Sequence, residues 1–321
     1  MVTWDKVVLC SNILGGAEIF TLERMLARKD TASLYCNGTL MELILADNRY
    51  NSIKIYECQC LNRLASQINL LHIRTAARGL APLLERGEVV LGNLRAASIQ
   101  IASEFAGRNT AFIHDNTNSL NIKNRVLISI IGIRSRLILF PCRHSSGNLP
   151  FRGVFESKLA FEYFSSYKLL TPKPLRTYDT LRIINVGRIE KNKNQLLAVQ
   201  IASRLASVFS RIELTLLGNP EDENYFRLLE NQDIPVNLTL IQREVRRSEV
   251  PAALIEHDIV LHTSFIESLP LVLFEANSSE VPFFAIGTGG IPEVLPVEYI
   301  IDSDPQTAAT QIYRLIGRVV N

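Results

Sequence analysis

The chain has 321 residues, too many for one typical hydrophobic core and about right for two domains of roughly 100 to 200 residues. Hydrophobic residues make up 47% of it and charged residues 21%, which excludes long disorder and is typical of a globular protein. The formal net charge of +2 argues against a dedicated nucleic-acid-binding protein, which would carry a larger surplus of lysine and arginine.

The amino terminus, "MVTWDKVVLCSNILGG", lacks the basic and apolar regions of a signal peptide, and no apolar run reaches the ~20 residues that span a bilayer. All five cysteines lie in the first half, and Cys58 and Cys60 have no second metal-type pair to join them. We therefore expect reduced thiols in a cytoplasmic protein.

In the first half, short apolar runs alternate with segments of helical length, such as 17–29, 39–47 and 61–79. The runs are, in chain order, "KVVLCSNI", "ASLYCNG", "SIKIYEC", "VVLGN", "TAFIHD" and "LILFP". Short apolar strands between helices indicate parallel strands covered on both faces, which is the doubly wound α/β pattern.

The alternation breaks at "SYKLLTPKPLRTYDT", residues 166–180, where two prolines hold the backbone extended. We place a linker there and predict a first domain over residues 1–170 and a second over 171–321. The second half resumes with the strand-like runs "LRIINVG", "RIELTLLG", "VNLTLIQ", "DIVLHTS" and "PFFAIG", separated by helical segments at 192–209, 221–231, 248–256 and 270–280. We expect a second α/β domain.

Ligands of doubly wound sheets bind at the carboxyl ends of the strands, so the chemistry should lie just after strands. After the first strand, Gly15 and Gly16 would let the backbone approach a phosphate, although a tight turn without a ligand explains them equally well. His114 ends a later strand and could contact a sugar hydroxyl, or bond to the local backbone. The other four histidines, which we interpret as structural, are His72, His144, His257 and His262.

The first strand of the second domain runs into "VGRIEKNKNQ", where Arg188 and Lys193 surround a turn that leads into a helix. Two cations beside a helix amino terminus are a setting that neutralises a diphosphate. Lys191 competes with Lys193 for this role, and a solvated basic turn is the alternative interpretation.

The stretch "ESLPLVLFEANSSEVPFFAIGTGGIPEV" sets Glu267 and Glu275 eight positions apart. Ser264 and Glu267 could form a capping box, but Pro270 favours a helix that starts at the proline, with Glu267 in the loop before it. Glu275 then lies in the second helical turn, about 8 Å along the axis at ~1.5 Å per residue. This spacing favours two acids that grip different hydroxyls of one ligand over the acid and base of a glycosidase, and "GTGGIPE" adds a glycine turn whose amides could meet phosphate or sugar.

Several of these motifs together resemble retaining glycosyltransferases of family 4, which have two facing Rossmann-like domains in the architecture called GT-B. The matching segments are "GRIEKNKN", "VRRSEVP", "HDIVLHTSFIESLP", the Glu-x7-Glu pattern and "VPFFAIGTGGIPEV", with "GGAE" and "HD" in the first half. The sequence departs from the family pattern at Val245, Thr263 and Ser268, where glycine, proline and glycine are usual.

The resemblance implies a fold of two doubly wound Rossmann-like domains that face each other across a cleft, an acceptor-side domain and a donor-binding domain. It implies that Arg188 and Lys193 hold the diphosphate, that Glu275 holds the ribose, and that the segment from Val245 to Arg247 meets the base. Glu267 and the amides near Leu271 and Val272 would hold the donor sugar. From the first domain, Gly16, beside Gly15, would approach the phosphates across the cleft, and His114 would lie beside the anomeric region.

The implied activity is that of a hexosyltransferase that moves a sugar from a UDP- or GDP-linked donor, with retention, to a polysaccharide, lipid-linked or protein acceptor in polysaccharide biosynthesis. No DxD motif among these segments offers a metal site, so we expect neither a metal nor another cofactor. The alternatives are a nucleotide-sugar 2-epimerase and a non-catalytic GT-B subunit. A cytoplasmic protein on the inner membrane is plausible, because "NIKNRVLISIIGIRSRLILF" mixes basic and apolar residues, although a core helix with a basic edge would give the same pattern.

Overall fold

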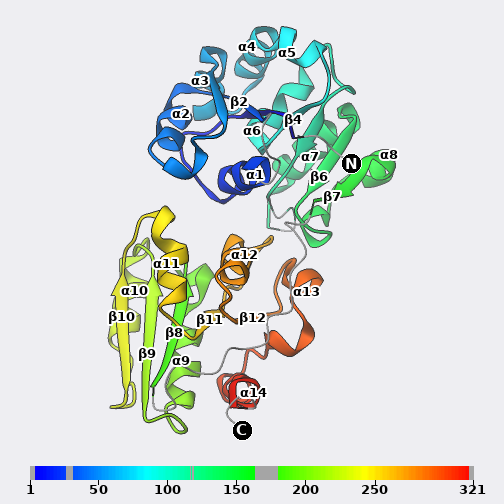
Figure 1. Ribbon diagram of the computed structural model, residues 1–321. Coiled ribbons are helices and arrows are strands. Elements are labelled where there is room, and N and C mark those ends of the chain that lie inside the picture. The colour runs from blue at the N-terminus through cyan, green and yellow to red at the C-terminus, as the bar shows by residue number, and fades with distance from the viewer. Residues whose placement is uncertain (1–3, 27–31, 116, 118, 163–179, 318–321) are drawn as a thin grey trace. The chain divides into compact units, whose positions relative to one another are not determined.

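The computed structural model describes residues 4–26, 32–115, 117, 119–162 and 180–317, and the chain divides into two compact units, residues 1–164 and 165–321 (Figure 1). The predicted linker, residues 166–180, lies outside the described residues except for Thr180, as does the predicted boundary after residue 170. Each unit is an α/β structure with parallel strands, as the sequence predicts.

The first unit is built on a seven-stranded sheet in the order β3-β2-β1-β4-β5-β6-β7, in which all neighbouring strands are parallel. In that order the strands are Lys54–Glu57, Ser33–Cys36, Lys6–Leu9, Val89–Leu91, Thr110–Phe112, Leu137–Phe140 and Leu159–Phe161. The helices α1 to α8 are Gly16–Leu26, Gly38–Leu45, Asn62–Ser66, Leu70–Gly79, Ala81–Glu85, Leu94–Ala97, Ile122–Arg134 and Arg152–Phe155. Short 3₁₀ turns η1 to η5 are Asn48–Tyr50, Gln59–Leu61, Ser98–Ile101, His144–Ser146 and Glu156–Lys158.

The second unit has a six-stranded sheet in the order β10-β9-β8-β11-β12-β13, also parallel between neighbours. In that order the strands are Leu238–Arg243, Arg211–Leu217, Thr180–Val186, Ile259–His262, Phe283–Ile286 and Ile300–Ile301. The helices α9 to α14 are Gln195–Leu205, Glu223–Glu230, Val250–Ile255, Leu271–Ser278, Ile291–Val294 and Pro305–Gly317. The 3₁₀ turns η6 to η8 are Lys191–Lys193, Arg247–Glu249 and Val297–Tyr299.

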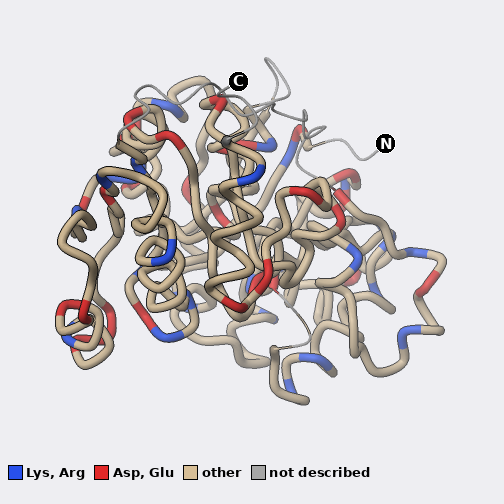
Figure 2. The backbone as a smooth tube through the Cα atoms, turned by 90° about the horizontal axis from the view of Figure 1, so that it is seen from below, with Lys and Arg blue, Asp and Glu red and all other residues tan. Residues whose placement is uncertain are grey.

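Central strands are buried on both faces, which is why they read in the sequence as unbroken apolar runs. All four residues of β11 are buried, and so are the three residues of β4. Around the first sheet the core includes an aromatic cluster in which Phe20 of α1 stacks on Phe112 of β5, with ring centroids 5.2 Å apart. Basic and acidic residues are scattered among one another along the backbone (Figure 2), in keeping with a net charge near zero.

The predicted helix at 61–79 is divided in the structure. Helix α3 ends at Ser66, and Asn69 begins α4 by accepting a hydrogen bond from the amide of His72. An asparagine at the N-cap satisfies an otherwise unpaired amide, so this residue favours a new helix start over a continuous helix. The short strands β7 and β13 were not predicted, because two or three residues give too little periodicity to detect.

In each sheet, successive strands are first added on one side of the first strand and then on its other side. The chain goes outward from β1 to β2 and β3 and returns to β4 on the other side, and it goes from β8 to β9 and β10 before it returns to β11. The loops after β1 and β4, and those after β8 and β11, therefore leave in opposite directions. Such a switch point is where open parallel sheets bind ligands.

Candidate functional site

The loop after β8 places the two cations that the sequence singled out in different surroundings. Lys193 ends η6, and its side chain is 21% exposed. Arg188 is 62% exposed and pairs with Glu190 at 3.2 Å, and Lys191 is exposed as well. Lys193 is therefore the cation of this loop that the fold turns inward, whereas Arg188 stays at the surface, where a ligand could recruit it.

The tight turn at the end of β8 requires glycine. Gly187 has a φ of +148°, and the nearby Gly218 at the end of β9 has a φ of +156°. A Cβ atom on Gly218 would lie 2.1 Å from the carbonyl oxygen of Gly187, so no other residue fits this close approach of two backbones. The turn thereby fixes the direction in which the chain leaves β8 towards Lys193.

The loop after β11 is tied to the loop after β8 by several hydrogen bonds. The amide of Phe265 donates to the carbonyl oxygen of Asn192 at 2.9 Å, and the hydroxyl of Thr263 donates to that of Asn194 at 2.9 Å. The Asn185 side chain, buried in β8, donates to the carbonyl oxygen of Leu261 at 2.7 Å. These bonds hold the two loops of the switch point together and bring Glu267 to Lys193.

Glu267 is the centre of a largely buried cluster of three ionisable side chains. Lys193 Nζ donates to Glu267 Oε1 at 2.6 Å, and His262 Nε2 lies 3.2 Å from the same oxygen. The side chains of Glu267 and His262 are only 11% and 4% exposed. Burial raises the pKa of the Glu267 carboxyl, but His262 and Lys193 together outweigh burial and hold this pKa well below its usual range. Glu267 is therefore an ionised, largely buried acceptor.

Helix α12 begins one residue after Pro270, the residue at which the sequence predicts its start. The proline occupies the N-cap position and Leu271 is the first helical residue, so Glu267 lies in the loop ahead of the helix. The capping box of Ser264 and Glu267 does not form, because both residues precede this helix start. The backbone amides of Leu271 and Val272 lie in the first turn of α12, where amides lack partners within the helix.

Glu275 lies in the second turn of α12, where the sequence placed it, and it forms an ion pair with Arg247. Arg247 opens η7, just after the loop that contains Val245. The side chains of Arg247 and Glu275 are 28% and 17% exposed, so the pair is largely removed from solvent. The structure thus connects the segment predicted to meet the base with the acid predicted to hold the ribose.

The glycine turn at residues 287–290 supports the loop that carries Glu267. Gly289 has a φ of +61°, and a Cβ atom there would lie 2.2 Å from the carbonyl oxygen of Glu267. The amide of Gly290 donates to the carbonyl oxygen of Ser268 at 2.7 Å, and the hydroxyl of Thr288 donates to that of Ser264 at 3.1 Å. The turn is therefore pressed against the backbone of this loop.

In the first unit, the predicted residues Gly16 and His114 come together. Gly16 is the first residue of α1, and a Cβ atom on it would lie 3.9 Å from His114 Cε1. The His114 ring packs edge-to-face on Phe20, with centroids 5.5 Å apart. Gly15, His114 and Gly16 belong to this unit, and all the other predicted site residues belong to the second unit.

Sequence reasoning missed the polar residues that hold the first glycine turn. Glu18 is 6% exposed and accepts hydrogen bonds from the Gly15 amide at 3.1 Å and from the Asn93 side chain at 2.8 Å. Asn93 follows β4 on the other side of the switch point and N-caps α6. Burial raises the pKa of the neighbouring Asp115 carboxyl. The only sequence signal for this arrangement was an acid, Glu18, two residues after the glycine pair. Its partner Asn93 is 75 residues away in the chain.

Neither a metal cluster nor a disulfide is found in the described part of the chain. No group of three or more histidine, cysteine, aspartate or glutamate side chains there is arranged to hold a metal ion, and all five cysteines are free. Within the same residues, no helix combines the length and the apolar character that crossing a membrane requires.

In α7, the segment predicted to contact lipid, Ile122, Ile130 and Ile133 are exposed. Arg134 at the end of this helix donates hydrogen bonds to the carbonyl oxygens of Gln100 and Ser103.

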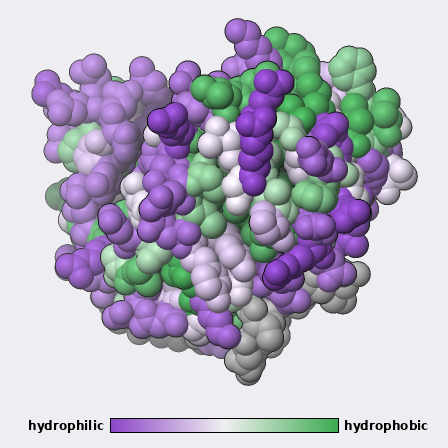
Figure 3. All heavy atoms as spheres, turned by 90° about the horizontal axis from the view of Figure 1, so that it is seen from above, coloured by the Kyte–Doolittle hydropathy of each residue, from purple (hydrophilic) through white to green (hydrophobic). Residues whose placement is uncertain are grey.

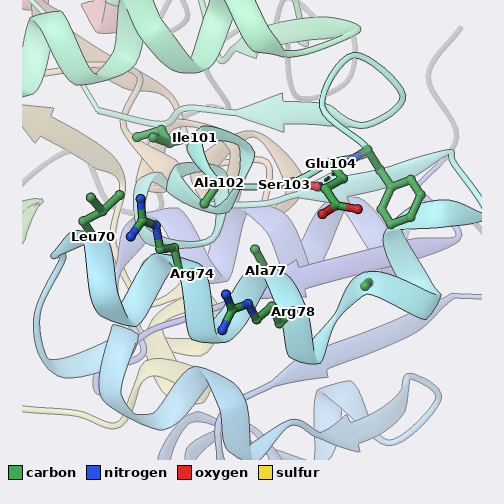
Figure 4. Close-up of a pocket in the computed structure, with 10 residues that line it drawn as sticks. Leu70, Arg74, Ala77, Arg78, Ile101, Ala102, Ser103 and Glu104 are labelled. Carbon is green, nitrogen blue, oxygen red and sulfur yellow. Dashed lines mark hydrogen bonds between the residues drawn. The ribbon is translucent and has the colours of Figure 1, made fainter.

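A cavity of about 440 Å³ in the first unit lies between α4 and the segment of residues 101–105 (Figure 4). Arg74 and Arg78 project from α4 along one side of it, and Ile101 and Ala102 form the other. Both arginines are exposed, as expected for a solvated helix face, and none of the predicted site residues lines the cavity. On the face of the molecule shown in Figure 3, hydrophilic and hydrophobic residues are intermixed.

Comparison with known proteins agrees with this architecture. Residues 171–316 match the family model of glycosyl transferases group 1. The chain is 27% identical over 150 residues to the phosphatidylinositol N-acetylglucosaminyltransferase GPI3 subunit of Saccharomyces cerevisiae, which covers 46% of this chain and 33% of the yeast protein. It is 26% identical over 119 residues to the corresponding gpi3 subunit of Schizosaccharomyces pombe, covering 37% and 26% of the two chains. The matches therefore span about a third or less of the length of these relatives.

Solved structures match nearly the whole chain. Anabaena Alr3699/HepE in complex with UDP superposes with a TM-score of 0.73 at 18% identity, over 97% of this chain and 90% of that one. The lipopolysaccharide outer core galactosyltransferase WaaB superposes with a TM-score of 0.64 at 15% identity, over 98% and 90%. The protein therefore has the GT-B glycosyltransferase fold, and its second unit matches glycosyl transferases group 1.

Proposed function

We propose that the protein is a metal-independent, retaining glycosyltransferase that moves a sugar from a UDP- or GDP-linked donor to an acceptor. The observation that carries this proposal is the presence of two ion pairs in the second unit, Lys193 with Glu267 and Arg247 with Glu275. Each contact joins two residues predicted to bind neighbouring parts of one donor. The matched glycosyltransferase domain contains all four residues.

Each proposed contact uses a group with matching chemistry. Lys193 and the surface residue Arg188 neutralise the diphosphate and the charge that grows on it as the glycosidic bond breaks. Glu275 accepts hydrogen bonds from the ribose hydroxyls, and Glu267 accepts them from the donor sugar. The first-turn amides of α12, at Leu271 and Val272, add uncharged donors.

Further contacts are proposed for the base and for the first unit. The segment of residues 245–247 contacts the base, next to the acid that holds the ribose. Gly16, with Gly15, approaches the phosphates, and His114 stands beside the anomeric region. In support of a nucleotide-sugar ligand, Alr3699/HepE, which shares the fold, has been solved with UDP-glucose.

For the acceptor we propose a lipid-linked molecule at the cytoplasmic face of a membrane, with polysaccharide and protein as the alternatives. Both yeast relatives described above are named as phosphatidylinositol N-acetylglucosaminyltransferase subunits, and phosphatidylinositol is a lipid. A peripheral contact with the membrane would suit such an acceptor, and the exposed isoleucines of α7 provide apolar surface for it.

The test begins with a thermal-shift screen of UDP- and GDP-sugars in buffer containing EDTA, since a ligand that binds the folded state raises the melting temperature. A donor that binds is then supplied with short-chain lipid acceptors, and the anomeric configuration of the product is read by NMR. Transfer with retention in EDTA supports the proposal. Binding without transfer indicates a non-catalytic subunit, and an epimerised sugar formed without acceptor indicates an epimerase. Activity that EDTA abolishes and Mg²⁺ or Mn²⁺ restores contradicts metal independence.

A further inference from the structure

The cavity in the first unit is bounded by two arginines whose charges the fold leaves uncompensated. Arg74 and Arg78 lie one turn apart on α4, and both are exposed. Helix α4 contains no acidic residue, and neither arginine makes an ion pair or a side-chain hydrogen bond within the part of the chain that the structure describes. Like charges at this spacing destabilise a helix, so the pair costs stability unless a ligand neutralises it.

Other arginines around the cavity are used by the structure itself. Arg134 donates hydrogen bonds to the carbonyl oxygens of Gln100 and Ser103. Arg108 lies over the ring of Phe105, with its guanidinium carbon 5.6 Å from the centroid. These contacts fix one wall of the cavity before any ligand arrives, whereas the two arginines on the opposite wall remain available.

Most of the remaining lining is apolar. Ile101 and Ala102 face the arginines across the cavity, and Ala77 lies on the same helix as the arginines (Figure 4). The other apolar lining residues are Leu70, Ala81 and Phe105. The volume of about 440 Å³ falls within the ~300–1,000 Å³ of typical small-molecule sites. A ligand that matches this lining has a negatively charged group joined to an apolar one.

Two guanidinium groups favour a phosphate over a carboxylate. A guanidinium donates two parallel hydrogen bonds to one anion. A carboxylate has two oxygens, which one guanidinium engages, whereas a phosphate monoester has three terminal oxygens and can accept from both arginines at once. Side chains at i and i+4 begin about 5–6 Å apart, which lets Arg74 and Arg78 reach the same phosphate.

One acid, Glu104, also lines the cavity. Its side chain is exposed, and it belongs to the wall opposite α4 (Figure 4). A carboxylate there repels an anion but leaves two positive charges against one negative charge. Removal of the Glu104 charge should therefore strengthen the binding of an anion, which is the opposite of the effect expected for the arginines.

We propose that this cavity is a second ligand site, which binds a phosphate monoester of an apolar alcohol. Arg74 and Arg78 hold the phosphate, and the apolar group lies against Ile101 and Ala102. The inference does not rest on the proposed function, because none of the predicted site residues lines the cavity. A soluble phosphate ester and the headgroup of phosphatidic acid share this chemistry, and the test separates them.

Calorimetric titration with phenyl phosphate tests the site, with phenol and inorganic phosphate as the separate halves of the probe. Phenyl phosphate should bind more tightly than either half. Arg74→Gln and Arg78→Gln should each weaken it about tenfold, the size expected when a charged hydrogen bond is missing, and Glu104→Gln should strengthen it. Ala102→Leu fills the apolar side, so it should weaken phenyl phosphate and leave inorganic phosphate unchanged.

Two control variants locate the binding. Arg86→Gln removes the charge of an exposed arginine of the same unit that does not line the cavity, and it should bind phenyl phosphate as the wild type does. Lys193→Gln removes a cation of the candidate site in the second unit, and the loss caused by Arg74→Gln should persist in this background. If Arg74→Gln and Arg78→Gln bind as Arg86→Gln does, or if Lys193→Gln alone abolishes binding, the proposal is wrong. Thermal melting shows whether each variant is folded.

Phosphatidylcholine vesicles with and without phosphatidic acid distinguish the two sources of the phosphate. Cosedimentation that requires phosphatidic acid, decreases in Arg74→Gln and is prevented by excess phenyl phosphate identifies a lipid ligand. Binding of phenyl phosphate without cosedimentation identifies a soluble ester, and either result supports the proposal. Cosedimentation by a protein that does not bind phenyl phosphate indicates a charged surface in place of a ligand cavity and overturns it.

Discussion

Replacing Gly289 with alanine should displace the acid at the centre of the candidate site. Gly289 has a φ of +61°, and this left-handed conformation costs a residue with a side chain roughly 1–2 kcal/mol. The new Cβ would also lie 2.2 Å from the carbonyl oxygen of Glu267, although ordinary contact begins at 3.4 Å. Since the obstacle is backbone, the loop of residues 267–268 must move by about 1 Å.

That movement breaks identifiable contacts. The hydrogen bond from the Gly290 amide to the Ser268 carbonyl oxygen, 2.7 Å long, contributes about 0.5–1.5 kcal/mol. Together with the backbone strain, we expect Gly289→Ala to lower the free energy of unfolding by about 2–3 kcal/mol. Glu267 moves with its backbone, so the 2.6 Å contact with Lys193 should weaken and the affinity for a nucleotide sugar should fall.

The assay is urea denaturation followed by circular dichroism, combined with calorimetric titration of the nucleotide sugar. Gly287→Ala is the matched control, since Gly287 has no left-handed φ and the nearest atom to its added Cβ is the Cγ2 methyl of the Ile300 side chain at 3.1 Å. We expect the control to lose less than about 1 kcal/mol. If Gly289→Ala is as stable as Gly287→Ala and binds the donor equally well, the turn does not brace Glu267.

Three further predictions concern the charged residues of the site. Glu267→Gln should weaken a nucleotide sugar about tenfold or more while sparing the free nucleotide, whereas Glu275→Gln should weaken both; equal effects on both ligands contradict this division. Arg188→Ala and Lys193→Ala should each lower kcat in a transfer assay more than they raise KM, and unchanged kcat values would show that neither stabilises the leaving group. Because the pKa of Glu267 is lowered in the folded state, its contribution to stability is present above the ordinary glutamate pKa of about 4.3 and is lost as the pH falls below that value. In acid denaturation, the free energy of unfolding of Glu267→Gln should therefore decline less steeply below this pH than that of the wild type. Curves of equal slope would argue against an ionised Glu267.

Sequence patterns were sufficient for the architecture because the central strands are buried on both faces. Runs such as that of β11 leave a continuous apolar signal, and Pro270 marked the start of α12 within one residue. The strand order in each sheet could not be derived, because it depends on long-range pairing that no local pattern records.

Within the candidate site, the sequence indicated which residues are unusual but not which of them meet. Lys193 and Glu267 are 74 positions apart, and Arg247 and Glu275 are 28 apart, so their contacts follow from strand order and loop paths. His262 was interpreted as structural because its surroundings in the sequence do not match those of His114. Its closeness to Glu267 arises from the turn of the loop between β11 and α12, which periodicity does not describe.

The loop that carries Glu267 is held on one side by the carbonyl group of Asn192 and on the other by the amide of Gly290. The conformational entropy of ordering this loop is therefore lost when the protein folds and not when a ligand arrives. Association with a donor should then proceed without a slow ordering step in this loop, and affinity differences among donors should appear chiefly in their dissociation rates.

The exposed side chains of Phe265 and Ile266, 63% and 49% accessible, project from this fixed backbone. They can be exchanged for other residues, or for a fluorescent reporter, with little effect on the geometry of the acid beside them.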